Sequence, residues 1–127
     1  MSKINVRYIV NDVEAAVPFY RDLLGFKVDM HPGPGFASLS LDGVSLMINK
    51  PGGCGGAGQS IPDGSSPAPG GWNRMQLEVE DIDATYAKLK AAGASFRNEV
   101  ITGNGGKQVL VEDPSGNPIE LFQPFAR

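Results

Sequence analysis

The sequence predicts an α+β fold in which one β-α-β-β-β plan is used twice. Two segments open on V-x-D and close on glycine with helical spacing between, Val10–Phe26 and Val79–Phe96. Two further segments match as late strands, Asp42–Asn49 and Ser115–Phe122. A Gly/Pro-rich stretch, 51–71, separates the halves. Such internal repetition indicates modules that each leave an apolar face uncovered. We therefore expect one domain over 1–127, made of module 1–50, loop 51–71 and module 72–127.

The first module reads in order as strand, helix and three strands. Alternating apolar residues predict a strand over 3–10, and Asn11 or Asp12 can cap the helix that follows. Pro18 removes a backbone donor inside that helix and should bend it. The predicted elements are a helix at 13–24, strands at 26–30, 36–41 and 44–49, and a turn at 31–35.

The second module follows the same order after a flexible loop or linker. Asp81 can cap its helix and Gly93 can end it. Asp113-Pro114-Ser115-Gly116-Asn117 has the composition of a chain reversal between two short apolar runs. The predicted elements are strands at 72–79 and 95–101, a helix at 82–92, a turn at 102–106, and a hairpin whose strands include 109–111 and 118–122.

Composition narrows the function classes. The net charge is −3 and no Lys/Arg cluster occurs, which disfavours a nucleic-acid or anionic-membrane partner. No apolar run approaches membrane-spanning length, and the N-terminus lacks the plan of a signal peptide. The single cysteine, Cys54, excludes an intrachain disulfide, so we expect a cytoplasmic protein in which Cys54 is unreactive. His31, in a Pro/Gly turn, is expected to be solvated.

Three segments carry a resemblance to a known family: VNDVEAAVPFYRDLLGF, VEDIDATYAKLKAAG and EDPSGNPIELFQP. They resemble the vicinal-oxygen-chelate superfamily, which includes glyoxalase I, bleomycin-resistance proteins and extradiol dioxygenases. The resemblance covers nearly the whole chain outside the Gly-rich loop. It implies that the two modules form a larger curved sheet, with both helices on the convex side and a cup on the concave side. It also implies a homodimer.

The resemblance also indicates where a catalytic metal would be held. The metal enzymes of the family place ligands at the start of the first strand and in the last strand of each half. In this sequence those positions hold Asn5, Met47, Arg74 and Glu120. Only Glu120 matches the expected His, Glu or Gln, and Arg74 is permanently cationic. We therefore expect no metal and no other cofactor.

Glu120 lies between Ile119 and Leu121, where a carboxylate needs a partner. If the repeat alignment holds, Arg74 faces it and the two form an ion pair. The pair is either purely structural or also an anchor for a ligand. The other candidate ligand-binding residues are apolar side chains and hydrogen-bonding groups of the expected cup, namely Phe36, Trp72, Phe122, Asn5, Met47, Arg7 and Gln76.

Three functions remain open from the sequence. The first is a metal-free, antibiotic-like small-molecule-binding protein similar to the bleomycin-resistance members. The second is an enzyme, either a divergent metal-dependent lyase or dioxygenase or an acid–base catalyst that uses Glu120. The third is an interaction protein whose cup is unused. The catalytic residues are unknown, and the ligand set favours the first function.

Overall fold

The computed structural model describes residues 4–52 and 58–126. These fall into two compact units, Met1–Pro69 and Gly70–Arg127, and each unit is described by itself. The boundary lies near the end of the Gly/Pro-rich segment. The prediction that the modules together form one curved sheet with a shared cup concerns their relative placement, and it stays a prediction.

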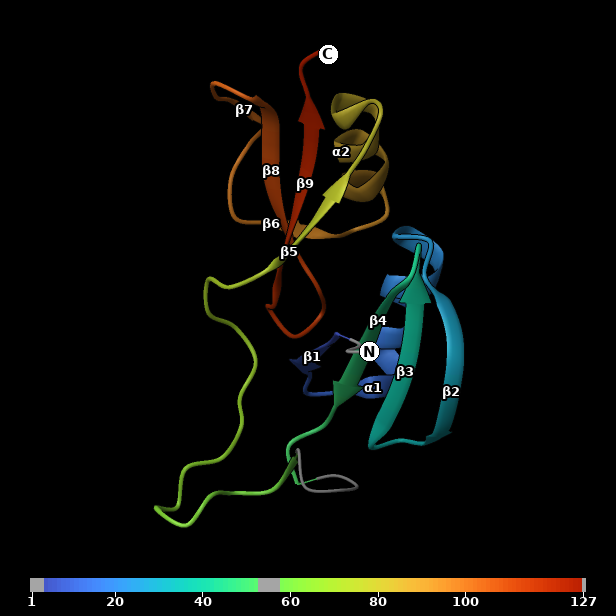
Figure 1. Cartoon of the computed structure of the whole chain (residues 1–127), viewed down its shortest axis with the longest axis vertical. Coiled ribbons are helices and arrows are strands. Elements are labelled where there is room, and N and C mark those ends of the chain that lie inside the picture. The colour runs from blue at the N-terminus through green and yellow to red at the C-terminus, as the bar shows by residue number, and fades with distance from the viewer. Residues whose placement is uncertain (1–3, 53–57, 127) are drawn as a thin grey trace. The chain divides into compact units, whose positions relative to one another are not determined.

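The first unit is a four-stranded mixed sheet with one helical segment against it (Figure 1). The strand order is β1-β4-β3-β2, where β1 pairs with β4 in parallel and the other pairs are antiparallel. The buried side chains Leu39, Leu46 and Ile48 alternate with more exposed ones, as expected for strands covered on one face. The elements are β1 (Asn5–Ile9), α1 (Val13–Pro18), η1 (Phe19–Leu23), β2 (Lys27–Gly33), β3 (Phe36–Leu41) and β4 (Val44–Asn49).

The helical segment changes its form at Pro18, and the expected bend there stays a prediction. The Asp12 side chain caps α1 by accepting from the Ala15 backbone N–H at 3.3 Å. The α-helix ends at Pro18 and continues as a π-helical turn, η1. Because proline lacks the N–H that an α-helical bond needs, the chain widens at this point. The wide turn buries both Phe19 and Tyr20, and the Tyr20 ring meets those of Phe19 and Phe26 edge to face.

The predicted turn at 31–35 is shorter than expected, because β2 continues to Gly33. The strand lies at the sheet edge and carries register shifts on either side of Met30, and an edge strand tolerates Pro32 because it need not donate on its outer side. The expectation of a solvated His31 is therefore wrong. His31 lies in β2 and is only 25% exposed, with its Nε2 2.8 Å from Glu14 Oε1.

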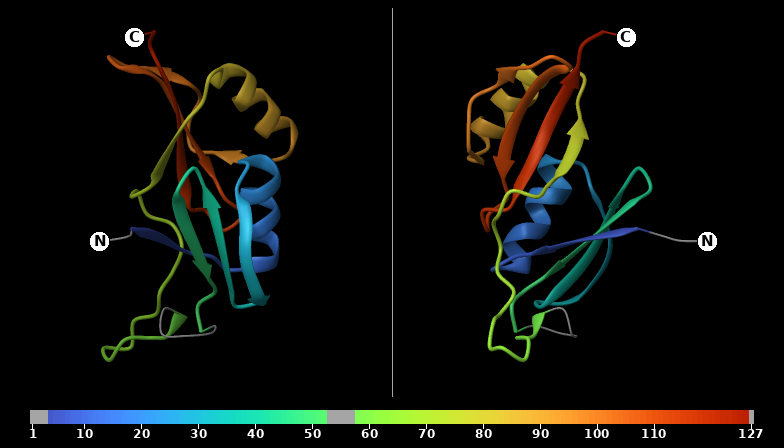
Figure 2. Two further views of the ribbon diagram at one scale, coloured as in Figure 1. Left: turned by 45° about the vertical axis from the view of Figure 1, so that its right-hand side comes forward. Right: turned by 60° about the vertical axis from the view of Figure 1, so that its left-hand side comes forward.

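The second unit is a mixed sheet with the strand order β5-β9-β8-β6, in which β7 also pairs with β8. β5 and β9 are parallel, whereas β8 and β9 form the predicted antiparallel hairpin. Helix α2 packs against β8 and β9 (Figure 2), and the Asp81 side chain caps it by accepting from the Ala84 N–H. The elements are β5 (Met75–Glu78), α2 (Ile82–Ala91), β6 (Ser95–Phe96), β7 (Ile101–Thr102), β8 (Gly106–Glu112) and β9 (Pro118–Pro124).

Two predicted strands of this unit are shorter than expected. The strand predicted at 72–79 begins at Met75, opposite Ile119 of β9; one residue earlier the partner would be Pro118, which has no N–H to donate. The strand predicted at 95–101 is interrupted between β6 and β7. There the Leu110 N–H donates to the Asn98 side-chain oxygen at 2.9 Å, so a side chain replaces a backbone partner.

The described part of the Gly/Pro-rich segment forms local turns. Ile61 and Ser65 bond through their backbones, and the Asp63 carboxylate accepts from the Ser65 N–H at 2.8 Å. Cys54 lies outside the described residues, so its expected inertness stays a prediction. Among the described residues, none of the helices has the length and apolar character needed to cross a membrane.

Candidate functional site

The side chain of Glu120 is the centre of a polar cluster on the second unit. Ile119 and Leu121 are fully buried on the sheet face that α2 covers. Glu120 and Phe122 therefore project from the opposite face, because successive side chains of a strand alternate. We call this opposite face the open face of the second unit.

The predicted partner of Glu120 is present. Arg74 donates from Nε and Nη2 to Oε1 of Glu120, at 3.0 and 2.8 Å. Gln76, which stands opposite Glu120 in the strand register, donates from Nε2 to Oε2 at 2.8 Å. Both carboxylate oxygens therefore accept hydrogen bonds, although the two arginine bonds converge on one oxygen rather than forming a parallel pair.

Burial explains why Glu120 needs these donors. Its side chain is 10% exposed, whereas that of Arg74 is 29% exposed. A carboxylate removed from water is stable only when charged or dipolar donors replace its hydration.

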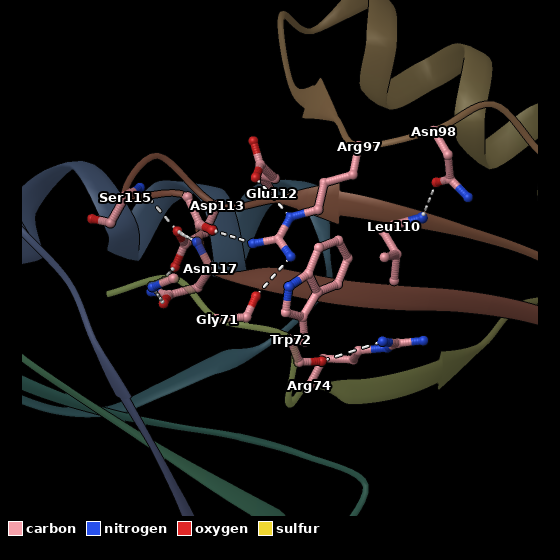
Figure 3. Close-up of polar contacts among 12 residues, drawn as sticks. Gly71, Trp72, Arg74, Arg97, Asn98, Leu110, Glu112, Asp113, Ser115 and Asn117 are labelled. Carbon is pink, nitrogen blue, oxygen red and sulfur yellow. Dashed lines mark hydrogen bonds and ion pairs between the residues drawn. The ribbon is translucent and has the colours of Figure 1, made fainter. Parts of the chain in front are cut away.

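Trp72 lies on the loop just before β5 and is 68% exposed. Its ring faces the guanidinium of Arg97, whose Cζ is 4.6 Å from the ring centroid (Figure 3). The Trp72 carbonyl also accepts from Nη1 of Arg74 at 3.2 Å. Arg74 thus links Trp72 to Glu120. Phe122 is on the same strand as Glu120, and its ring lies next to Gly105. A Cβ added at Gly105 would be 3.8 Å from the Cζ atom of that ring.

In the first unit the structure brings two of the predicted residues, Arg7 and Met47, into contact. Arg7 and Met47 stand opposite each other in the parallel β1–β4 pair, and Nη2 of Arg7 lies 3.6 Å from the Met47 sulfur. Nη1 of Arg7 donates to the Asn49 side-chain oxygen. Asn5 is exposed opposite Ser45, and Phe36 is paired with Asn49.

Sequence reasoning missed two residues of these clusters. Asn49 is buried at 2% exposure and accepts from Arg7. It lies two residues after Met47 on β4, and because residues two apart in a strand share a face, this spacing was the available signal. Arg97 follows β6 and reaches Trp72 only through the fold, so sequence spacing gave no indication of it.

The residues at the family's metal positions do not fit a divalent metal. Zinc and related ions take about three protein donors drawn from His, Cys, Asp and Glu, and no grouping of three such residues that could hold a metal ion occurs within 4–52 and 58–126. At the one carboxylate in a matching position, Glu120, the Arg74 guanidinium already binds Oε1. A fixed cation there opposes a second cation.

Comparison with known proteins identifies the family. The model of the Glyoxalase/Bleomycin resistance protein/Dioxygenase superfamily matches residues 4–121. The chain belongs to this superfamily. The match spans both modules and the intervening segment, which confirms the fold class expected from the repeat.

Relatives of the superfamily include proteins with and without a named ligand. The chain is 32% identical over 126 residues to YwbC, an uncharacterized protein of Bacillus subtilis (strain 168), with 91% of each chain covered. It is 28% identical over 120 residues to the bleomycin resistance protein of Geobacillus stearothermophilus, with 90% of each covered. Among solved structures, TnmS3, an antibiotic binding protein from Streptomyces sp. CB03234, matches with a TM-score of 0.69, 25% identity and 98% of each chain covered.

Proposed function

We propose that this superfamily member is a metal-free small-molecule-binding protein that takes an antibiotic-like aromatic or amphipathic compound. The observation that carries the proposal is that both carboxylate oxygens of Glu120 already accept hydrogen bonds from protein side chains. In place of metal ligands, the open face of the second unit presents Arg74 and Gln76, both bonded to that carboxylate. The printed names of two similar proteins, a bleomycin resistance protein and an antibiotic binding protein, support this class of ligand.

The proposed ligand contacts are a set of polar donors beside exposed apolar surface. Arg74 is fixed by its bonds to Glu120 and to the Trp72 carbonyl, so its remaining N–H groups are held in place. Trp72 and Phe122 supply aromatic surface near this anchor. Mostly apolar surface with a few oriented polar groups is typical of small-molecule sites. In the first unit, Arg7, Asn5, Met47 and Phe36 are the corresponding candidates.

The test is calorimetric titration of the purified protein with bleomycin and a panel of planar aromatic antibiotics, in buffer with and without EDTA. We expect at least one compound to bind at micromolar concentration, with the same affinity in both buffers. Affinity that disappears with EDTA, or turnover of a glyoxalase or dioxygenase substrate on addition of Zn²⁺, Ni²⁺, Fe²⁺ or Mn²⁺, would support the enzyme alternative. The absence of binding across the panel would contradict the proposal.

We further propose that the protein is a cytoplasmic homodimer, as the family resemblance implies. Light scattering at micromolar concentration should give the mass of two chains of 13.4 kDa. A monomer mass at that concentration would contradict this proposal and would also exclude a ligand site formed by two copies.

A further inference from the structure

The most exposed large aromatic side chain of the second unit, Trp72, has a guanidinium packed against one face of its ring. Trp72 is 68% exposed, yet one face of its indole ring lies against the Arg97 guanidinium, with Cζ 4.6 Å from the ring centroid. Figure 3 shows the guanidinium beside the indole ring, with dashed lines from it to Glu112 and to the Gly71 carbonyl. A cation at this distance from an indole face is attracted to it electrostatically.

Arg97 is held in place by three further contacts. Its Nε donates to Glu112 Oε2 at 2.9 Å, Nη1 donates to the Gly71 carbonyl at 2.7 Å, and Nη2 donates to the Gly116 carbonyl at 3.0 Å. The side chain is only 17% exposed. All three guanidinium nitrogens therefore donate hydrogen bonds. These bonds to β8, to the β8–β9 turn and to the loop before β5 fix the position of the guanidinium plane against the Trp72 ring.

The loop that carries Trp72 is fixed independently of Arg97. The Gly70 N–H donates to Oδ1 of Asn117 at 2.8 Å, and Asn117 is 4% exposed. The backbone carbonyl of Trp72 also accepts from Nη1 of Arg74 at 3.2 Å. The indole is thus anchored before any ligand arrives, and a preorganised side chain loses little conformational entropy on binding.

We propose that Arg97 is a positioning residue that makes Trp72 a rigid stacking platform for a planar aromatic ring, and that the platform prefers anionic over cationic rings. The proposal rests on the small-molecule function proposed above and specifies the ligand's chemistry. Arg97 lies on one face of the indole, and the 68% exposure of Trp72 leaves surface for a second ring on the other. An offset stack of two aromatic rings is favourable there.

The charge preference follows from the position of Arg97. An indole attracts a cation through the negative potential of its face. A guanidinium already on one face draws that electron density toward itself, so a second cation on the opposite face gains less and is repelled by the first. An anionic ring is attracted by the same guanidinium. The net charge of the chain is −3, which at long range favours a cation; a preference for an anion must therefore have a local cause.

The experiment compares two probes of the same shape, 2-naphthoate and 2-naphthylmethylammonium, at neutral pH and fixed ionic strength. Trp72 is the only tryptophan in the chain, so its indole N–H gives one identifiable signal in a ¹H–¹⁵N spectrum of the whole protein. We expect each probe to shift that signal, so that both affinities can be measured from it. 2-Naphthoate should bind about threefold tighter than 2-naphthylmethylammonium, or more. Equal or reversed affinities, or no movement of the indole signal at millimolar probe, would overturn the proposal.

Three variants separate positioning from fold maintenance, each used only after its thermal unfolding shows a folded protein. Arg97→Gln removes the charge and leaves Glu112 without its cationic partner, so the preference for 2-naphthoate should be lost or reversed. Arg97→Lys keeps the charge but not the planar fork, so both affinities should fall while the ratio is kept. Arg21→Ala, a change at an exposed arginine, should alter neither. A ratio that is unchanged in Arg97→Gln would refute the role of Arg97; if that variant does not fold, the wild-type ratio and Arg97→Lys decide.

The outcome also separates this inference from the proposed function. Movement of the indole signal by 2-naphthoate with no binding of any antibiotic would support the platform and contradict the broader function. Antibiotic binding that leaves the indole signal unmoved would support the function and overturn the platform.

Discussion

Removing one partner of the Arg74–Glu120 pair tests the central contact of the site. In Arg74→Ala the Glu120 carboxylate keeps only the Gln76 donor on Oε2 and loses both donors on Oε1. Breaking a fully buried pair costs about 3–5 kcal/mol, whereas exposed pairs contribute about 0.2–1 kcal/mol. With side-chain exposures of 10% for Glu120 and 29% for Arg74, we expect a loss of about 2 kcal/mol.

Glu120→Gln should cost less, about 1 kcal/mol. The neutral amide oxygen can still accept from Arg74, and the partly exposed guanidinium can turn toward water. The amide nitrogen, however, would face the Nε2 donor of Gln76, so one hydrogen bond is lost unless the Gln76 amide reverses.

The assay is urea denaturation of both single variants, the double variant and the wild type, followed by circular dichroism. The double-mutant cycle should give a coupling free energy of about 1–2 kcal/mol. Glu80→Gln and Arg21→Ala make the same chemical changes at exposed positions and should change stability by under about 0.5 kcal/mol. A coupling energy indistinguishable from zero would show that Arg74 and Glu120 do not meet, and the assignment of Arg74 to the position of a metal ligand would then be wrong.

Three other measurements test the second unit. Gly106→Ala should destabilise by about 2 kcal/mol or more in the same assay, because its Cβ would lie 2.2 Å from the Gln123 carbonyl oxygen; Gly105→Ala, whose nearest atom is 3.8 Å away, should be tolerated, and equal effects would contradict this. Asp113→Ala should cost about 2 kcal/mol by leaving the buried Asn117 N–H without its acceptor, and a loss under 0.5 kcal/mol, about that of a surface change, would contradict it. Elemental analysis after mild purification should find no stoichiometric Zn, Ni, Fe or Mn, and about one ion per chain would contradict the Glu120 argument.

The fold could be predicted from the sequence because its signals are local. Asp12 and Asp81 cap the two helices as expected, and strands β3 and β4 have the predicted bounds. The errors occur where a distant residue decides. β5 begins late because its partner strand starts at Pro118, and the strand predicted at 95–101 is interrupted where Asn98 bonds to Leu110.

The site was predictable to the extent that it follows the repeat. The internal repeat, together with the ligand positions that the family resemblance implies, brought Arg74 to Glu120. Arg97 could not be found in this way, because its contacts with Trp72, Glu112 and Gly116 join a loop, a strand and a turn that are adjacent only in three dimensions.

The π-helical turn η1 also bears on the history of the repeat. The capping residue and the closing glycine of the first helix, Asp12 and Gly25, stand one residue further apart than their counterparts Asp81 and Gly93. A single π turn takes up one extra residue within a helix. The wide turn in the first unit and the regular α2 in the second are thus what a one-residue insertion or deletion between two copies of an ancestral module would leave behind. Its position after Pro18, where an α-helical bond is already missing, is where such a change in length would disturb the helix least.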